Sequence, residues 1–258
     1  VIIAETGETL TYGALEDTAN QGAHYFRSLG IRAGETVAIW LPNGLHYFEV
    51  YWAAQRAGLY ITPISTKLTA EEAAYILDDS EARLLVASGA IAALPGLLEI
   101  AAEQSPGRPK GIRLPLSGGP ATEPHMLAEK QQQRYGVNED SVFLSPAPLY
   151  HTAPLAFCTS AHRLGATVVM MEKFTPEGAL AAIDRYKVTF TQMVPTMFLR
   201  MLRLPKAERA RYDVSSLRHV VHAAAPCPVE VKRAMIEWFG PIIYEYCGGS
   251  EGNGSTFI

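Results

Sequence analysis

The sequence predicts an α/β fold in which stacked, mostly parallel sheets are flanked by helices. Short apolar runs typical of buried strands alternate with amphipathic helical runs along most of the chain. Glycine, proline and asparagine separate these runs, and the 48% hydrophobic content supports a large buried core. Strands that are separated by helices pair in parallel through right-handed crossovers, so helices are expected on both faces of each sheet.

The first part of the chain carries three helices and three strands in alternation. Thr11 is a plausible N-cap for a helix that runs through Leu29, and Gly30 is its expected end. The remaining elements are a strand at 35–40, a helix at 46–57, a strand at 60–64, a helix at 70–79 and a strand at 83–87. A further helical stretch is expected at 91–103.

The second part repeats the same alternation. Strands are expected at 142–145, 166–171, 188–193, 217–221 and 242–246, and helices at 155–163, 176–186, 196–204 and 228–239. The sequence therefore predicts two stacked α/β halves, at about 1–104 and 105–258, rather than two unrelated domains.

Composition and charge exclude several classes of function. A net charge of -4 and a pI of about 6.0 argue against a general nucleic-acid surface. The basic residues at 200–211 are expected to form a solvated face, with a partner-binding role as the alternative. Cys158, Cys227 and Cys247 are too irregularly spaced for a disulfide framework or a zinc site, so we expect three buried thiols.

The sequence also predicts a cytoplasmic protein. No apolar run approaches the ~20 residues of a membrane span, so no integral membrane segment is expected. The first residues lack the basic start and apolar core of a signal peptide.

Residues 220–253 carry the strongest chemical signal. A turn of small residues, Ala223–Pro226, precedes an amphipathic helix. A short apolar strand follows and ends in an aromatic, glycine-rich and acidic cluster at Tyr244–Glu251. A flat and mostly uncharged surface beside a carboxylate suits a nucleotide base with a metal-bound phosphate nearby. The alternative for the turn is a simple helix entry with Pro228 near the first turn, which explains the proline but not the three alanines.

Five stretches, in matching order, resemble AMP-forming acyl-CoA synthetases (fatty-acid–CoA ligases) of the adenylate-forming superfamily. They are residues 9–43, 107–111, 145–151, 191–202 and 216–252. The resemblance implies that residues 1–258 form a partial N-terminal AMP-binding domain, the large domain of these enzymes. It also implies that the small C-terminal domain with the catalytic lysine is absent from this chain. Because a Ser/Thr/Gly-rich phosphate loop should precede Lys110, we expect residues to be missing near 105–106.

The resemblance implies roles for named side chains. Those assigned to the nucleotide are Lys110, Ala223, Ala224, Ala225, Pro226, Tyr246, Cys247 and Gly248. Those assigned to catalysis are His151, Ser250 and Glu251, of which Ser250 contacts the α-phosphate and Glu251 holds Mg²⁺. Those assigned to the acid substrate are His151 at the acyl carbonyl, with Met193 and Thr196 in the pocket wall.

Several of these residues have plainer interpretations. His151 could be an ordinary histidine at a turn, and Met193 at a strand end could be plain core. Residues 106–111 alone would read as an exposed basic turn. Cys247 stands where the family usually has a tyrosine that stacks on adenine, so stacking area is lost unless Tyr246 compensates.

The resemblance implies an AMP-forming carboxylate–CoA ligase that uses ATP, Mg²⁺ and CoA. Its partners would be these small molecules and a carboxylic acid, with no nucleic acid and a possible homodimer. A fatty acid is expected, because 145–155 and 191–202 are apolar and show no cation for a second carboxylate. The alternatives are a ligase that loads a carrier protein or uses an aryl acid, and a degenerate, non-catalytic nucleotide-binding module. Cys247 and the incomplete phosphate loop motivate the last of these.

Overall fold

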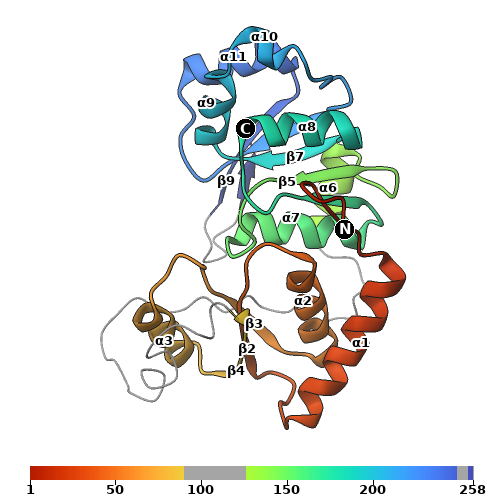
Figure 1. Cartoon of the computed structure of the whole chain (residues 1–258), viewed down its shortest axis with the longest axis vertical. Coiled ribbons are helices and arrows are strands. Elements are labelled where there is room, and N and C mark those ends of the chain that lie inside the picture. The colour runs from red at the N-terminus through yellow and green to blue at the C-terminus, as the bar shows by residue number, and fades with distance from the viewer. Residues whose placement is uncertain (90–125, 249–254, 258) are drawn as a thin grey trace. The chain divides into compact units, whose positions relative to one another are not determined.

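The computed structural model describes residues 1–89, 126–248 and 255–257 (Figure 1). The chain divides into two compact units. Unit 1 comprises Val1–Thr9, Pro124–Pro148 and Thr152–Ile258, and unit 2 comprises Leu10–Glu123 and Leu149–His151. The helix predicted at 91–103 and the join near 105–106 lie outside the described residues.

Unit 1 is built on a seven-stranded sheet with the order β1-β6-β5-β7-β8-β9-β10. The strands are β1 (Ile2–Ile3), β5 (Val142–Ser145), β6 (Thr167–Met170), β7 (Phe190–Met193), β8 (His219–His222), β9 (Ile243–Gly248) and β10 (Ser255–Phe257). All neighbouring pairs are parallel except β9 and β10, which are antiparallel. The prediction of a mostly parallel sheet is therefore confirmed for this unit.

Helices cover both faces of this sheet (Figure 1). The helices are α6 (Met126–Tyr135), α7 (Thr152–Arg163), α8 (Pro176–Tyr186), α9 (Pro195–Leu202), the short α10 (Lys206–Arg209) and α11 (Val229–Phe239). Alternate strand residues face opposite helices. Phe143 lies against Phe157 of α7, whereas the next residue, Leu144, packs into the core formed with α8, α9 and α11.

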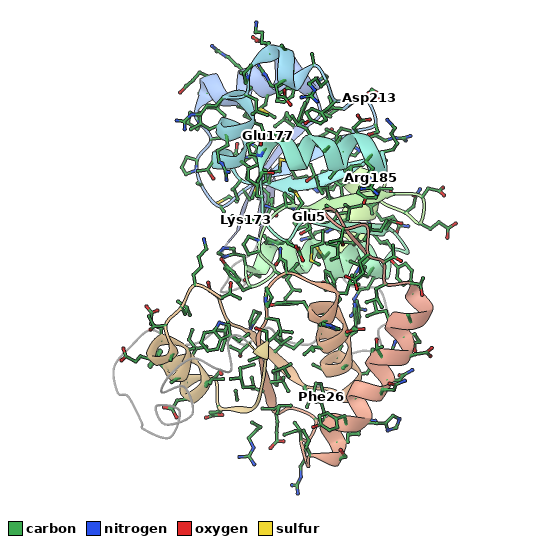
Figure 2. The ribbon with its side chains drawn as sticks, in the orientation of Figure 1. Glu5, Phe26, Lys173, Glu177, Arg185 and Asp213 are labelled. Carbon is green, nitrogen blue, oxygen red and sulfur yellow. The ribbon has the colours of Figure 1, made fainter. Side chains whose placement is uncertain are left out.

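Unit 2 contains a three-stranded parallel sheet with the order β3-β2-β4. Its elements are β2 (Thr36–Trp40), β3 (Tyr60–Pro63), β4 (Ala82–Ala87), α1 (Tyr12–Ser28), α2 (Leu45–Ala57) and α3 (Ala70–Asp79). Trp40 and Ala73 of α3 belong to a core of their own, and Phe26 of α1, labelled in Figure 2, is buried as well. Each unit therefore has its own buried interior.

Local capping explains where several helices begin and end. The Thr11 hydroxyl accepts a hydrogen bond from the Ala14 N–H at the start of α1, as the sequence predicts. Thr69 and Glu72 form a reciprocal capping box that starts α3. Gly58 ends α2 in the left-handed conformation, with φ of 74°. Among the described helices none is both long and apolar enough to cross a membrane.

Candidate nucleotide-binding site

The carboxyl ends of β7, β8 and β9 lie side by side in unit 1. His222, the last residue of β8, is in register with Met193 of β7 on one side and Glu245 of β9 on the other. The predicted turn Ala223–Pro226 follows β8 directly, and β9 ends at Gly248. Ligands of parallel α/β sheets bind outside the carboxyl ends of the strands, so the two predicted nucleotide segments meet at the appropriate edge.

The turn after β8 offers an open backbone. Ala223 is buried, whereas Ala224, Ala225 and Pro226 are exposed. Ala224 has φ of 74°, a left-handed conformation that costs a non-glycine residue about 1 kcal/mol or more. Because only methyl groups project from residues 223–225, a flat ring can approach this backbone closely.

A polar contact of three side chains lies next to the turn. The Lys232 ammonium of α11 donates a hydrogen bond to Glu245 Oε2 at 2.8 Å. The same oxygen lies 3.6 Å from Nε2 of His222, whose side chain is fully buried. The hydrogen bond from Lys232 is the main reason that the pKa of Glu245 is lowered. Burial lowers the pKa of His222 against the opposing effect of Glu245, so this imidazole is neutral at pH 7.

Tyr246 and Cys247 project from opposite faces of β9. The Tyr246 ring stacks on Phe157 of α7, with centroids 5.8 Å apart and planes 26° apart. Burial raises the pKa of Tyr246 to about 12, so the phenol keeps its proton. Cys247 and Gly248 are exposed at the strand end.

The expectation of three buried thiols is wrong for Cys247. Cys158 is fully buried in α7, and burial raises its pKa to about 12. Cys227 is half-buried. Cys247 differs because it lies one residue before the end of β9, where its backbone pairs with Thr256 of β10.

The family model for AMP-binding enzymes matches residues 1–108 and 105–258, which together cover the whole chain. The chain belongs to the AMP-binding enzyme family. The two matched segments meet at 105–108.

Curated members of the AMP-binding family are similar to this chain. Feruloyl-CoA synthase from an Amycolatopsis species is 30% identical over 253 residues, which cover 87% of this chain and 51% of that protein. The 4-coumarate–CoA ligase 1 of Petroselinum crispum is 26% identical over 280 residues, with 91% and 51% covered. The chain thus spans about half the length of the curated relatives it matches.

Solved structures share the fold of the chain. The amide bond synthetase McbA from Marinactinospora thermotolerans matches with a TM-score of 0.81 and 24% identity over 100% of this chain and 58% of that chain. The N-terminal domain of FACL13 from Mycobacterium tuberculosis matches with a TM-score of 0.81 and 22% identity over 100% and 74%. The predicted N-terminal domain fold of adenylate-forming enzymes is confirmed.

The structure places the residues predicted for the acid substrate in different surroundings. Met193 is fully buried in the core of unit 1, and Thr196 is exposed in the first turn of α9. His151 belongs to unit 2, where its ring lies 4.6 Å from that of Tyr150. Burial, followed by the positive charge of Lys67, lowers the pKa of His151. The acid-binding roles of these three residues stay predictions.

The residues predicted for phosphate and metal lie outside the described chain. They are Lys110, Ser250 and Glu251. Within residues 1–89 and 126–248, no group of three His, Cys, Asp or Glu side chains is placed to hold a metal ion. The base site at the ends of β8 and β9 and the Mg²⁺ end of the site both stay predictions.

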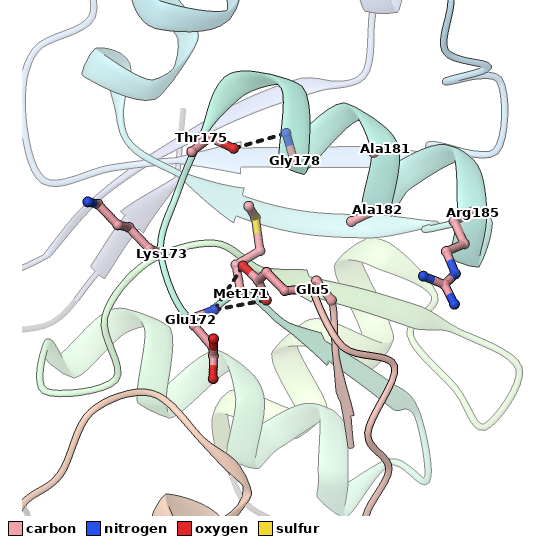
Figure 3. A pocket seen from close by; sticks show the side chains of 10 residues that line it. Glu5, Met171, Glu172, Lys173, Thr175, Gly178, Ala181, Ala182 and Arg185 are labelled. Carbon is pink, nitrogen blue, oxygen red and sulfur yellow. Dashed lines mark hydrogen bonds between the residues drawn. The ribbon is translucent and has the colours of Figure 1, made fainter.

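A separate pocket of about 470 Å³ lies beyond the carboxyl ends of β1 and β6, on the side of the unit 1 sheet away from β8 and β9 (Figure 3). Residues after β1 and β6 and the exposed side of α8 line it, including Glu5, Lys173 and Arg185, which are also labelled in Figure 2. The Glu5 carboxylate accepts the Glu172 N–H at 3.2 Å. None of the residues that the sequence assigns to the nucleotide or the acid lines this pocket.

Proposed function

We propose that the protein carrying this chain is an AMP-forming acid–CoA ligase. A carboxylate oxygen would attack the α-phosphorus of ATP and displace pyrophosphate, giving an acyl-adenylate. The CoA thiol would then attack the acyl carbonyl and release AMP. The observation that carries this proposal is the exposed small-residue turn at the end of β8, beside the exposed end of β9, in a chain matched throughout by the AMP-binding family.

The described residues would hold the adenine end of ATP. The open turn at Ala224 would let the base lie against backbone, and the exposed Cys247–Gly248 end of β9 would form the other wall. The Tyr246 ring stacks on Phe157, so it would give the end of β9 a fixed position beside the base. Because Cys247 offers less stacking area than an aromatic ring, the backbone would supply much of the contact.

The phosphates would be held by residues that lie outside the described chain. Lys110 would add a positive charge, Ser250 a hydroxyl at the α-phosphate and Glu251 a carboxylate for Mg²⁺. When bound, Mg²⁺ would neutralise phosphate charge and so favour the departure of pyrophosphate. The two matched segments that meet at 105–108 support our expectation that the phosphate loop is incomplete near 105–106.

The acid is proposed to be a fatty acid, with an aryl acid as the second candidate. The apolar segments at 145–155 and 191–202 favour an aliphatic chain. The names of the curated relatives favour an aromatic acid, since they include feruloyl-CoA synthase, 4-coumarate–CoA ligases and a 4-hydroxybenzoate/benzoate ligase. The three free cysteines agree with a reducing, cytoplasmic setting.

ATP–pyrophosphate exchange by the full-length protein tests this function. We expect exchange that depends on an acid, measured across a series of fatty acids and a series of cinnamic and benzoic acids. Glu251→Gln should lower the exchange rate by at least about a hundredfold, because a metal ligand at the phosphates is lost.

Exchange with no acid in either series would contradict the proposal. Nucleotide binding without exchange would instead support the non-catalytic module. Exchange only with aromatic acids would support the ligase proposal and would make an aryl acid, not a fatty acid, the substrate.

A further inference from the structure

Three titratable side chains from three elements meet directly behind the turn after β8. They are His222 at the end of β8, Glu245 in β9 and Lys232 in α11. Glu245 Oε2 joins them, at 2.8 Å from Lys232 Nζ and 3.6 Å from His222 Nε2. The family resemblance implies no role for any of the three.

His222 is an unusual residue for a buried strand end. Its side chain is fully buried, and within the described residues neither ring nitrogen has a hydrogen-bond partner. Leaving a buried polar group without such a partner costs about 1–3 kcal/mol. The surroundings are apolar on one side, because Phe198 of α9 packs edge-on against the imidazole with ring centroids 5.4 Å apart. An apolar side chain at position 222 would keep this packing and avoid the cost.

The neighbours of His222 determine which hydrogen bond its imidazole can form. Glu245 is the carboxylate that faces it, and Lys232 is the cation behind that carboxylate. Phe198 packs on the ring and Met193 is its in-register neighbour on β7, and both side chains are uncharged. A neutral imidazole that carries its proton on Nε2 can donate to Glu245 after a movement of a few tenths of an ångström, which would bring 3.6 Å to hydrogen-bond distance.

We propose that Glu245, held by Lys232, is a positioning residue that fixes His222 and thereby sets the geometry of the Ala223–Pro226 turn that receives the nucleotide base. The link is direct, because the peptide bond between His222 and Ala223 begins the turn. The left-handed conformation of Ala224, two residues after His222, needs support from its surroundings, and a fixed His222 would supply it on the β9 side. This inference rests on the proposed function, since it assigns residues to the same nucleotide site.

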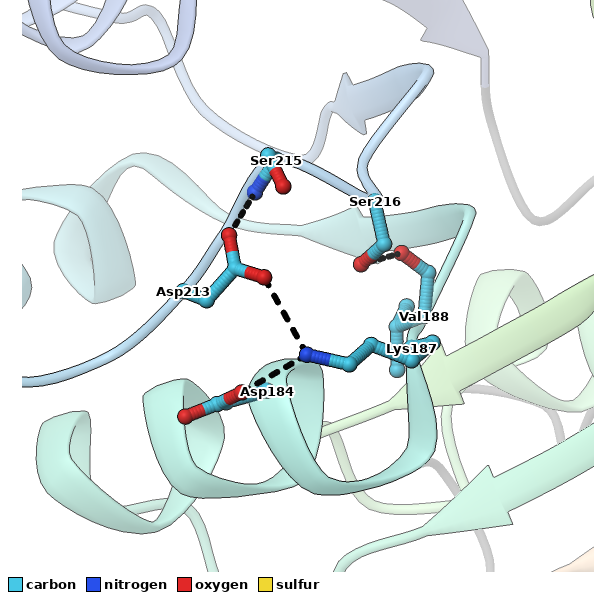
Figure 4. A network of polar contacts seen from close by, with 6 residues as sticks. All are labelled: Asp184, Lys187, Val188, Asp213, Ser215 and Ser216. Atoms are coloured by element: carbon cyan, nitrogen blue, oxygen red, sulfur yellow. Dashed lines mark hydrogen bonds and ion pairs between the residues drawn. The ribbon is translucent and has the colours of Figure 1, made fainter.

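The test compares nucleotide binding and kinetics in matched variants of the full-length protein. Glu245→Gln keeps the shape and removes the charge, Lys232→Met removes the cation, and Lys232→Arg restores a donor. The control is Lys187→Met, which breaks an exposed lysine–carboxylate contact with Asp184 and Asp213 at the end of α8 (Figure 4). AMP binding is measured by calorimetry, and KM for ATP and for the acid by pyrophosphate exchange, with melting temperatures recorded for every variant.

We expect Glu245→Gln and Lys232→Met to weaken AMP binding and to raise KM for ATP by about tenfold, as for coupled contacts that orient a binding segment. KM for the acid should stay unchanged, Lys232→Arg should recover most of the loss, and Lys187→Met should match the unsubstituted protein. A merely structural role would lower the melting temperature without this selectivity for the nucleotide.

The outcomes separate this inference from the proposed function. If the unsubstituted protein binds AMP and the Glu245 and Lys232 variants bind it equally well, the inference is overturned and the ligase remains. If AMP binds but no acid supports exchange, the ligase fails, and the comparison of AMP affinities still decides the inference. If AMP does not bind at all, both are overturned.

Discussion

At the scale of single residues, backbone strain distinguishes the turn after β8. Within the described chain, three non-glycine residues have positive φ: Glu81, Lys187 and Ala224. Lys187 is the C-cap of α8, and Glu81 follows the C-cap of α3, so helix ends account for both. Ala224 follows a strand, at the edge where the nucleotide is proposed to bind. Strained backbone conformations cluster at ligand-binding sites, so the strain at Ala224 supports a binding role for this turn.

Glycine at position 224 should therefore raise the free energy of unfolding, whereas glycine at position 225 should lower it. Ala224→Gly relieves about 1 kcal/mol of backbone strain in the folded state. It also raises the conformational entropy of the unfolded chain, which offsets part of this gain, so the free energy of unfolding should rise by roughly 0.5 kcal/mol in total. Ala225→Gly, in the same exposed turn but without a positive φ, should lose about 0.5–1 kcal/mol. Urea denaturation measures both. Equal losses in the two variants would mean that Ala224 is not strained.

At the scale of elements, one close helix contact shapes unit 2. A Cβ built on Gly22 of α1 would lie 2.7 Å from the Ala53 Cβ of α2, well inside van der Waals contact. Both atoms are fixed to helices, so neither can move away as a flexible side chain would. Glycine at position 22 therefore allows α1 and α2 to approach closely.

Gly22→Ala should separate the two helices and destabilise the protein by about 1–3 kcal/mol, the usual cost of overpacking. The matched control is Gly13→Ala in the same helix, whose Cβ would meet nothing closer than 4.0 Å. This control should be neutral or should gain up to about 1 kcal/mol from helix propensity. Thermal unfolding of the two variants is the measurement, and a Gly22→Ala variant as stable as the control would refute the close contact.

The elements also show what the sequence can and cannot predict. The bounds predicted for α3 and α8, 70–79 and 176–186, are those observed, and in the structure Thr69 with Glu72 and Thr175 with Pro176 start these helices locally. The strand β1 is not predicted, because its two residues form a strand only through pairing with β6, far along the chain. Such pairing leaves no local periodicity to read.

The sequence likewise predicts only part of the candidate site. The turn at 223–226 and the end of β9 are predicted from their composition and resemblance, and the structure places them side by side. The contact of His222, Glu245 and Lys232 is not predicted, because it depends on the register of β8 with β9 and on the position of α11. The exposure of Cys247 is missed because its apolar and small neighbours in sequence do not reveal that it lies at an exposed strand end.

At the scale of the whole molecule, the nucleotide edge belongs to one unit. The strands β7, β8 and β9, the turn and α11 all lie in unit 1, which has its own core. The chain belongs to the AMP-binding family over its full length and spans about half of the curated relatives it matches. The residues proposed for the base therefore lie in the described part of unit 1, and the proposed chemistry needs the segments around Lys110 and Glu251 as well.

The accessibility of Cys247 tests the nucleotide site most directly. Cys247 is exposed at the proposed base site, Cys227 is half-buried, and Cys158 is fully buried with a raised pKa. Alkylation rates of each thiol are measured by peptide mass spectrometry on the full-length protein, with and without ATP. With ATP at about ten times its Kd, about a tenth of the sites stay free, so alkylation of Cys247 should slow by about tenfold while Cys158 stays unreactive throughout. An unchanged rate at Cys247 would mean that ATP does not bind at the ends of β8 and β9, and would contradict the account.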